Sequence, residues 1–148
     1  MFSLIYCYNF LKNRHRGYKM RNRGATIILE QGRVALIKRT KPFTTYYVFP
    51  GGGIENGETP EEAAIRETYE ELGVHVKIQR LWKVLPYSGV QYYYLADIIG
   101  GTFGAGTGDE YKNPSQKKGS YEPVWINLQD LSSFDVRPKE IVEAILAD

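Results

Sequence analysis

The chain has 148 residues and a single cysteine, Cys7, so no internal disulfide can form. A lone cysteine suits a reducing compartment, and we therefore expect a cytoplasmic protein. No apolar run approaches the roughly 18–20 residues of a membrane-spanning helix, so we expect no membrane partner. The N-terminal apolar residues precede the basic ones, which is the reverse of the order in a secretory signal and argues against one.

Two common signatures of nucleotide and metal sites are also missing. The glycine-dense stretch GGTFGAGTG, residues 100–108, is not followed by the Lys-Ser/Thr pair of a phosphate-binding loop. The two histidines, His15 and His75, do not have the spacing of metal ligands. We therefore expect a plain loop at 100–108 and no metal on either histidine.

The net charge of +2 conceals an uneven distribution of charge. Residues 1–24 contain no acidic residue, and their basic residues are Lys12, Arg14, Arg16, Lys19, Arg21 and Arg23. We interpret this run as a solvated tail and expect no nucleic-acid partner; the alternative is an arm whose affinity for nucleic acid falls steeply with salt. The length suits one domain, so we divide the chain into a basic appendage, residues 1–19, and a domain, residues 20–148.

Several β-rich runs predict strands. Residues 25–30 and 33–39 flank Gln31 and Gly32, which predicts a hairpin. Further strand-like runs cover residues 44–50, 74–85, 90–99 and 123–128, and an amphipathic helix is expected at 138–146. With one more helix at 59–72, the order β-β-β-α-β-β-β-α predicts an α/β fold in which helices pack on a mixed sheet.

The helix expected from Thr59 to Leu72 has the clearest boundaries. Thr59 can cap it, Pro60 suits the first helical position, and Glu62 completes a capping box with Thr59. Gly73 is a natural terminator.

On a wheel at about 100° per residue, this helix has two faces. The face expected to pack on the sheet contains Ile65, Thr68, Tyr69 and Leu72. The opposite face contains Ala63, Glu67, Glu70 and Glu71, with Arg66 at its edge. Like charges at these spacings repel by roughly 0.2–0.5 kcal/mol per pair, so a positive group should stand opposite the glutamates.

A hard divalent cation is the natural positive group. Mg²⁺ prefers oxygen ligands, often one or two carboxylates with waters and substrate phosphates. The preceding glycines, Gly51 to Gly53, have no side chains and can bring backbone carbonyls close. Glu58 lies just before the helix and can approach the same end.

The stretch from Gly52 to Val74 resembles the signature of the Nudix hydrolases, G-x5-E-x7-R-E-U-x-E-E-x-G-U, in which U is apolar. The fixed positions are matched by Gly52, Glu58, Arg66, Glu67, Glu70, Glu71 and Gly73. Thr68 stands at an apolar position, where its methyl group can still pack. The resemblance extends from about residue 23 to the end and implies the family's α/β/α sandwich, with the signature helix and the C-terminal helix packed on the sheet.

The resemblance also implies an activity, which is hydrolysis of a nucleoside diphosphate linked to another moiety X with the help of Mg²⁺ or Mn²⁺. The metal ligands that it implies are Glu67, Glu70, Glu71 and the carbonyl of Gly51. It assigns Arg66 to the catalytic site, where it orients the glutamates. The residues that it implies as support for the motif are Gly52, Glu58 and Gly73.

The resemblance leaves the general base open between Glu67 and Glu110, with Glu122 as a weaker candidate, because members of the family differ at this point. A base must lie within about 3 Å of the attacking water, which a sequence does not show. Arg39 ends a strand near the glycine loop and is our candidate for binding substrate phosphates.

The substrate also stays open among a modified nucleoside triphosphate, a dinucleoside polyphosphate and a nucleotide sugar. We expect a small-molecule nucleotide as the partner, and a homodimer is left open. The alternative function is a non-catalytic Nudix-fold module that binds a nucleotide or regulates another protein.

Overall fold

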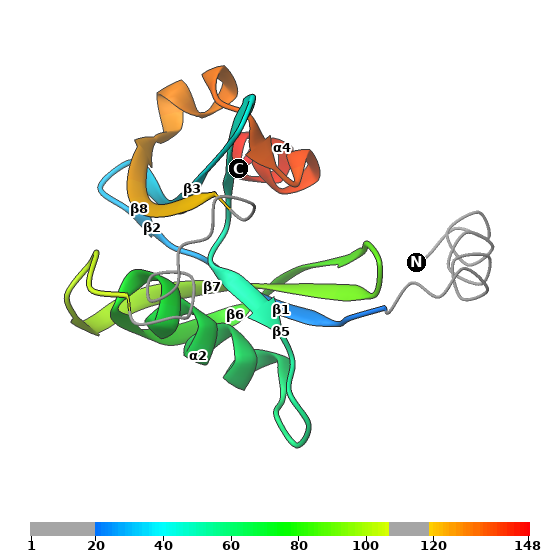
Figure 1. Cartoon of the computed structure of the whole chain (residues 1–148). Coiled ribbons are helices and arrows are strands. Elements are labelled where there is room, and N and C mark those ends of the chain that lie inside the picture. Colours follow the sequence, from blue (N-terminus) through cyan, green and yellow to red (C-terminus); the bar gives the residue numbers. More distant parts are fainter. Residues whose placement is uncertain (1–19, 107–118) are drawn as a thin grey trace.

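The computed structural model describes residues 20–106 and 119–148, which form two β-sheets with helices on either side (Figure 1). One sheet has the strand order β5-β1-β7-β6, and the other has the order β2-β3-β4-β9 with β8 paired to β3. The elements are β1 (Arg23–Ile27), β2 (Leu29–Glu30), β3 (Arg33–Lys41), β4 (Thr44–Val48), β5 (Gly51–Gly53), α2 (Pro60–Leu72), β6 (Val74–Pro86), β7 (Val90–Gly101), β8 (Ser120–Asn127), the 3₁₀ helix η1 (Leu128–Ser133), β9 (Val136–Arg137) and α4 (Lys139–Ala147). Neither α-helix in these two ranges is long and apolar enough to cross a membrane.

Both sheets mix parallel and antiparallel pairing. In the first, β1 runs parallel to β7 and antiparallel to β5, which is the edge strand. In the second, β3 is central, with β8 on one side and β2 and β4 on the other. The short strand β5 therefore ends one sheet at the point where the chain passes from β4 of the other sheet into the loop before α2.

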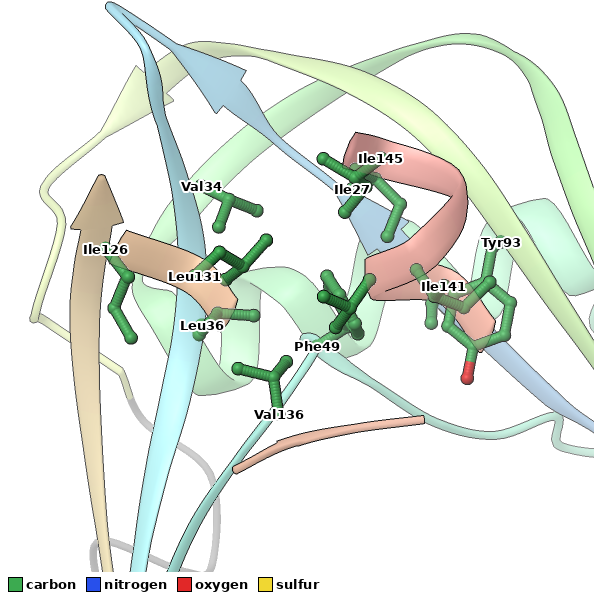
Figure 2. Packing of buried hydrophobic residues seen from close by; sticks show 12 residues of the cluster. Ile27, Val34, Leu36, Phe49, Tyr93, Ile126, Leu131, Val136, Ile141 and Ile145 are labelled. Atoms are coloured by element: carbon green, nitrogen blue, oxygen red, sulfur yellow. The ribbon is translucent and has the colours of Figure 1, made fainter. Parts of the chain in front are cut away.

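The helices α2 and α4 lie on opposite sides of β1, because alternate residues of a strand face opposite ways. Thr26 faces α2, where its hydroxyl is hydrogen-bonded to that of Thr68 at 2.8 Å, and both residues are fully buried. Ala25 and Ile27 face the other way and join an apolar cluster with Ile141 of α4 (Figure 2). Burial of one such isoleucine contributes about 1.5–3 kcal/mol. The predicted α/β/α sandwich is confirmed.

The ends of α2 follow the predicted signals. The backbone N–H of Glu62 donates to the Thr59 hydroxyl at 3.1 Å, and the N–H of Thr59 donates to the Glu62 carboxylate at 3.3 Å. At the other end Gly73 adopts a left-handed conformation with φ 78°, and its N–H donates to the carbonyl of Tyr69. Because the caps fix where α2 begins and ends, they also fix which way its glutamates point.

The hairpin predicted from residues 25–30 and 33–39 is correct only around its turn. Leu29 and Glu30 pair with β3, whereas residues 25–27 pair with β5 and β7 in the other sheet. Residues 24–28 are all buried, as suits an interior strand. A two-residue turn determines only the pairing of the residues next to it, here residues 29–30 with β3. Residues 25–27 pair with β7, which lies far away in the sequence, so no local sequence pattern predicts this pairing.

The predicted wheel of α2 is wrong at two positions. Ala63 was placed with the glutamates but is fully buried, and Tyr69 was placed against the sheet but is 40% exposed. A Cβ on Gly24 of β1 would overlap the carbonyl of Pro60, so this glycine allows the start of α2 to lie directly against β1, where Ala63 becomes buried. Tyr69, one turn before the end, stacks instead on His75 of β6, with ring centroids 4.4 Å apart.

The buried pair of hydroxyls generates a prediction. Thr68→Val keeps the volume but leaves the Thr26 hydroxyl without its partner, and we expect the free energy of unfolding to fall by about 1–3 kcal/mol. The double variant Thr26→Val/Thr68→Val removes both polar groups and should lose less than the sum of the two single variants. Urea denaturation of all four proteins measures this coupling, and strictly additive losses would show that the two hydroxyls do not interact.

Candidate active site

Arg66 lies among the carboxylates of the signature. Its Nε and Nη2 donate to the two oxygens of Glu58 at 2.7 and 3.0 Å, a bidentate pairing. Its Nη1 donates to Glu67 at 3.0 Å and to Glu70 at 3.3 Å. Nη2 also donates to the backbone carbonyl of Gly53 at 3.0 Å. One guanidinium thus links the loop before α2, the edge strand β5 and two turns of the helix.

These contacts change the ionisation of the cluster. The hydrogen bonds from Arg66 are the main cause that lowers the pKa of Glu58 below its usual range, and the backbone N–H of Glu55 adds a further bond at 3.1 Å. The pKa of Arg66 is raised, chiefly by its hydrogen bonds to Glu58; burial opposes this rise, and the hydrogen bond to Glu67 adds to it. Both groups are therefore charged at neutral pH. The repulsion expected among the glutamates of α2 is offset by Arg66, a cation on the same helix.

The glycines of β5 allow the carboxylates to approach the backbone closely. A Cβ on Gly52 would overlap the carboxylate of Glu67. The N–H of Gly51 donates to Oε2 of Glu71 at 3.2 Å. Any side chain at position 52 would therefore displace Glu67, which gives a steric reason for glycine there.

An open pocket of about 480 Å³ lies at this edge of the sheet. Its lining contains the two glutamates Glu67 and Glu71 together with three arginines. The charged and aromatic residues of the lining that bear on its chemistry are Arg21, Arg23, Arg39, Glu67, Glu71 and Tyr121.

The residues present fit a divalent metal ion held jointly with a substrate. In the ranges 20–106 and 119–148, no three His, Cys, Asp or Glu side chains form a group that could hold a metal by themselves. Mg²⁺ does not need three, because it is commonly held by one or two carboxylates together with phosphate oxygens and waters. Glu67 and Glu71 supply two carboxylates beside the carbonyl of Gly51, which accepts a hydrogen bond from Arg23 at 3.3 Å and has a second lone pair.

The other residues proposed from the sequence lie at different places. Glu70 pairs with Arg66 and is not part of the pocket lining, and Gly73 caps α2. Arg39 lines the pocket, with its guanidinium 3.7 Å from the ring centroid of Tyr121. Glu122 pairs in register with Lys38 on β3 and is not part of the lining. Glu110 lies outside the described residues.

Sequence reasoning missed several residues of the pocket. Arg21 and Arg23 were counted as part of the basic N-terminal run, yet both line the pocket. Their spacing of two residues at the start of a strand was the available signal, because such residues share a face. Gln91 also lines the pocket, and its Oε1 accepts a hydrogen bond from the hydroxyl of Tyr93 at 2.7 Å. Burial raises the pKa of Tyr93 to about 12, so its hydroxyl keeps this proton at neutral pH.

The fold and the glutamate helix beside a glycine strand define the class of protein. A family model described as the NUDIX domain matches residues 19–145, and the chain belongs to this family. The ADP-ribose pyrophosphatase of Methanocaldococcus jannaschii is 38% identical over 90 residues, covering 54% of this chain and 52% of that protein. The RNA pyrophosphohydrolase of Gluconobacter oxydans is 31% identical over 121 residues, covering 77% of this chain and 66% of that protein. The matches thus span between about half and two thirds of the length of these relatives.

Solved structures show the same fold. A NUDIX hydrolase from Nitrosomonas europaea superimposes with a TM-score of 0.65 at 16% identity, covering 86% of each chain. A MutT structure from a study of Aliivibrio salmonicida and Vibrio cholerae gives a TM-score of 0.64 at 24% identity, covering 88% of this chain and 98% of that one. The recognition of the Nudix signature is confirmed.

The lowered pKa of Glu58 generates a prediction for stability against pH. An ionised Glu58 stabilises the folded state above its ordinary pKa of 4.5, and this contribution is lost as the pH falls through the lowered value. We therefore expect the free energy of unfolding to change less between about pH 6 and pH 3 in Glu58→Gln than in the unaltered protein. Urea denaturation at several pH values measures this difference. Glu61→Gln, an exposed glutamate of the same helix, should keep the full pH dependence, and equal curves for all three proteins would contradict the assignment.

Proposed function

We propose that this protein is a Mg²⁺- or Mn²⁺-dependent hydrolase that cleaves the phosphoanhydride bond of a nucleoside diphosphate linked to another moiety X. The observation that carries the proposal is the pocket at the edge strand β5, where Glu67 and Glu71 lie close to the glycine backbone and arginines complete the lining. Family membership supports it, and the relatives named above are described as pyrophosphatases or pyrophosphohydrolases.

Each group of residues has a separate task in this proposal. Glu67, Glu71 and the carbonyl of Gly51 would hold the metal, with Glu70 near them; bound there, the metal offsets charge on the phosphoryl oxygens and activates water. Arg66 and Glu58 keep Glu67 at the pocket, because Arg66 donates to both carboxylates. Arg39 is positioned to bind a phosphate group, since its guanidinium lies in the pocket lining over Tyr121.

The general base that accepts the proton of the attacking water is proposed to be Glu67 or Glu110. Glu67 lines the pocket, and Arg66 donates a hydrogen bond to its Oε1 at 3.0 Å, which holds this carboxylate in place. In either case the water oxygen forms a bond to phosphorus and gives its proton to the base. The bridging P–O bond of the phosphoanhydride breaks, and the leaving phosphate keeps the electron pair of that bond.

The substrate class is taken from the chemistry shared by the relatives. These relatives include an ADP-ribose pyrophosphatase and RNA pyrophosphohydrolases, and the feature that their substrates share is a diphosphate bond on a nucleotide. We propose a nucleotide of this kind as the partner of this chain, in a cytoplasmic setting, with the domain comprising residues 20–148. A homodimer stays an open prediction.

The metal assignment is tested by Glu71→Gln, which removes a charge but keeps the volume. We expect Mg²⁺-dependent turnover to fall by roughly 100-fold or more, since loss even of groups that only support a metal ligand commonly costs 10–100-fold. A panel of nucleoside diphosphate derivatives, scored for released nucleoside monophosphate or phosphate, supplies the assay. Chelation of the metal should abolish turnover and readdition should restore it.

The matched control is Glu61→Gln, because Glu61 lies on the same helix but not in the pocket lining. It should retain the activity of the unaltered protein. Full activity in Glu71→Gln would contradict the metal assignment. Nucleotide binding without release of product from any member of the panel would favour the non-catalytic module instead.

The general base is tested by comparing Glu67→Gln and Glu110→Gln at saturating Mg²⁺. Loss of the base should remove the fall of kcat on the acidic side of the pH profile, whereas loss of a residue that only supports the site should lower kcat while the profile keeps its shape. If both variants keep the acidic limb, neither residue is the base.

A further inference from the structure

At the free edge of β5, backbone groups bind charged side chains instead of a further strand. The N–H of Thr26 on β1 donates to the carbonyl of Pro50 at 2.9 Å, so the backbone of Pro50 faces β1. Because backbone groups of successive strand residues alternate in direction, those of Gly51 face away from β1. The N–H of Gly51 donates to Oε2 of Glu71 at 3.2 Å, and its carbonyl accepts from Nη2 of Arg23 at 3.3 Å. One glycine thus binds an acidic side chain and a basic one.

The backbone around Arg23 is held in place before this side chain reaches the glycine. Oδ1 of Asn22 accepts from the N–H of Val90 at 2.9 Å, and the carbonyl of Asn22 accepts from the N–H of Ile54 at 3.0 Å. These bonds join the start of β1 to β7 on one side and to the end of β5 on the other. The guanidinium of Arg23 is therefore directed to the carbonyl of Gly51 from a fixed strand, and it forms part of the pocket lining.

The carbonyl of Gly51 is also the backbone ligand proposed for the metal. Mg²⁺ binds oxygen at about 2.0–2.1 Å, so an ion on this carbonyl lies within about 5 Å of Nη2 of Arg23 if their hydrogen bond is kept. Both groups are positive and repel each other. If the guanidinium turns away instead, it loses its bond to the carbonyl. In both cases Arg23 makes binding of the metal alone less favourable.

An anionic group beside the metal reverses this effect. The oxygens of a diphosphate can bind the metal and accept hydrogen bonds from a guanidinium at the same time. Arg23 then contacts a negative charge instead of facing only another cation. The metal and the anion should therefore each bind more tightly when the other is present, and by the same factor, because coupling between two ligands is reciprocal.

We infer that Arg23 couples the two binding events, by opposing the metal when it is alone and by binding the diphosphate group once both are present. This inference rests on the proposed function, because it takes the metal site at Gly51, Glu67 and Glu71 as given. A purely structural role for Arg23, in which it only holds the carbonyl of Gly51 in place, predicts the opposite result. Removal of Arg23 would then weaken the binding of the metal alone.

The test measures the affinity for Mn²⁺ without turnover. Electron paramagnetic resonance reports the free ion, with and without adenosine 5′-methylenediphosphate, whose carbon bridge is not hydrolysed. Arg23→Gln should bind Mn²⁺ alone about tenfold more tightly, because Arg23 is exposed and its repulsion, screened as in water over about 5 Å, amounts to roughly this factor. The factor by which the diphosphate tightens Mn²⁺ binding should fall by at least about the same amount.

Three further variants act as controls. Arg23→Lys keeps the charge, so it should bind Mn²⁺ alone as weakly as the unaltered protein and keep part of the coupling. Arg80→Gln removes an exposed arginine of β6 that is not part of the pocket lining, and it should leave both affinities unchanged. Glu71→Gln should lose Mn²⁺ binding with and without the diphosphate. Circular dichroism melts of all variants check that each one folds.

The inference is overturned if Arg23→Gln binds Mn²⁺ alone no more tightly than the unaltered protein, or if both proteins show the same coupling factor. It falls together with the metal assignment if the unaltered protein binds no Mn²⁺ even with the diphosphate present. Coupling that depends on Arg23, without turnover of any nucleotide in the panel, would instead reject the proposed hydrolysis and leave the role of Arg23 standing.

Discussion

The ion pairs of Arg66 are the interaction on which the rest of the site depends. A helix with three glutamates at spacings of three and four residues repels itself, and their carboxylates would otherwise spread into solvent. Arg66 holds Glu67 and Glu70 on α2 and Glu58 on the preceding loop, and it bonds to the carbonyl of Gly53 in the edge strand. One guanidinium thereby connects the helix, the loop and the sheet. The carboxylates that remain for the pocket, those of Glu67 and Glu71, are held in place before any ligand arrives.

The glycine strand β5 gives this arrangement its close contacts. Each of its three glycines has a near neighbour where a side chain would stand, including the Glu67 carboxylate at Gly52 and the Arg21 guanidinium at Gly53. Because β5 is the edge of its sheet, acidic and basic side chains can reach it from opposite faces and meet in one pocket. The lining of this pocket of about 480 Å³ therefore contains both arginines and glutamates.

Much of the fold could be predicted because its signals are local. The capping box at Thr59 and the terminator Gly73 place the ends of α2 to the residue, and the α/β class follows from the order of the elements. The predictions were wrong where contacts between residues far apart in the sequence determine the structure. Ala63 is buried because Gly24, 39 positions earlier in the chain, lets the helix approach β1, and residues 25–27 join a different sheet from their neighbours because β7 pairs with them in parallel. Neither contact can be predicted from a helical wheel or from a turn motif.

The sequence by itself determined the family and the acidic half of the site, since the spacing from Gly52 to Gly73 lies within one loop and one helix and needs no knowledge of the rest of the chain. Only the tertiary structure decided the basic half. Arg21 and Arg23 looked like the end of a charged tail, and they become part of the pocket because β1 lies beside β5 and the β6–β7 turn fixes the backbone before it. Residues brought together by sheet pairing carry no fixed spacing, so their shared role becomes visible only once the strands are placed.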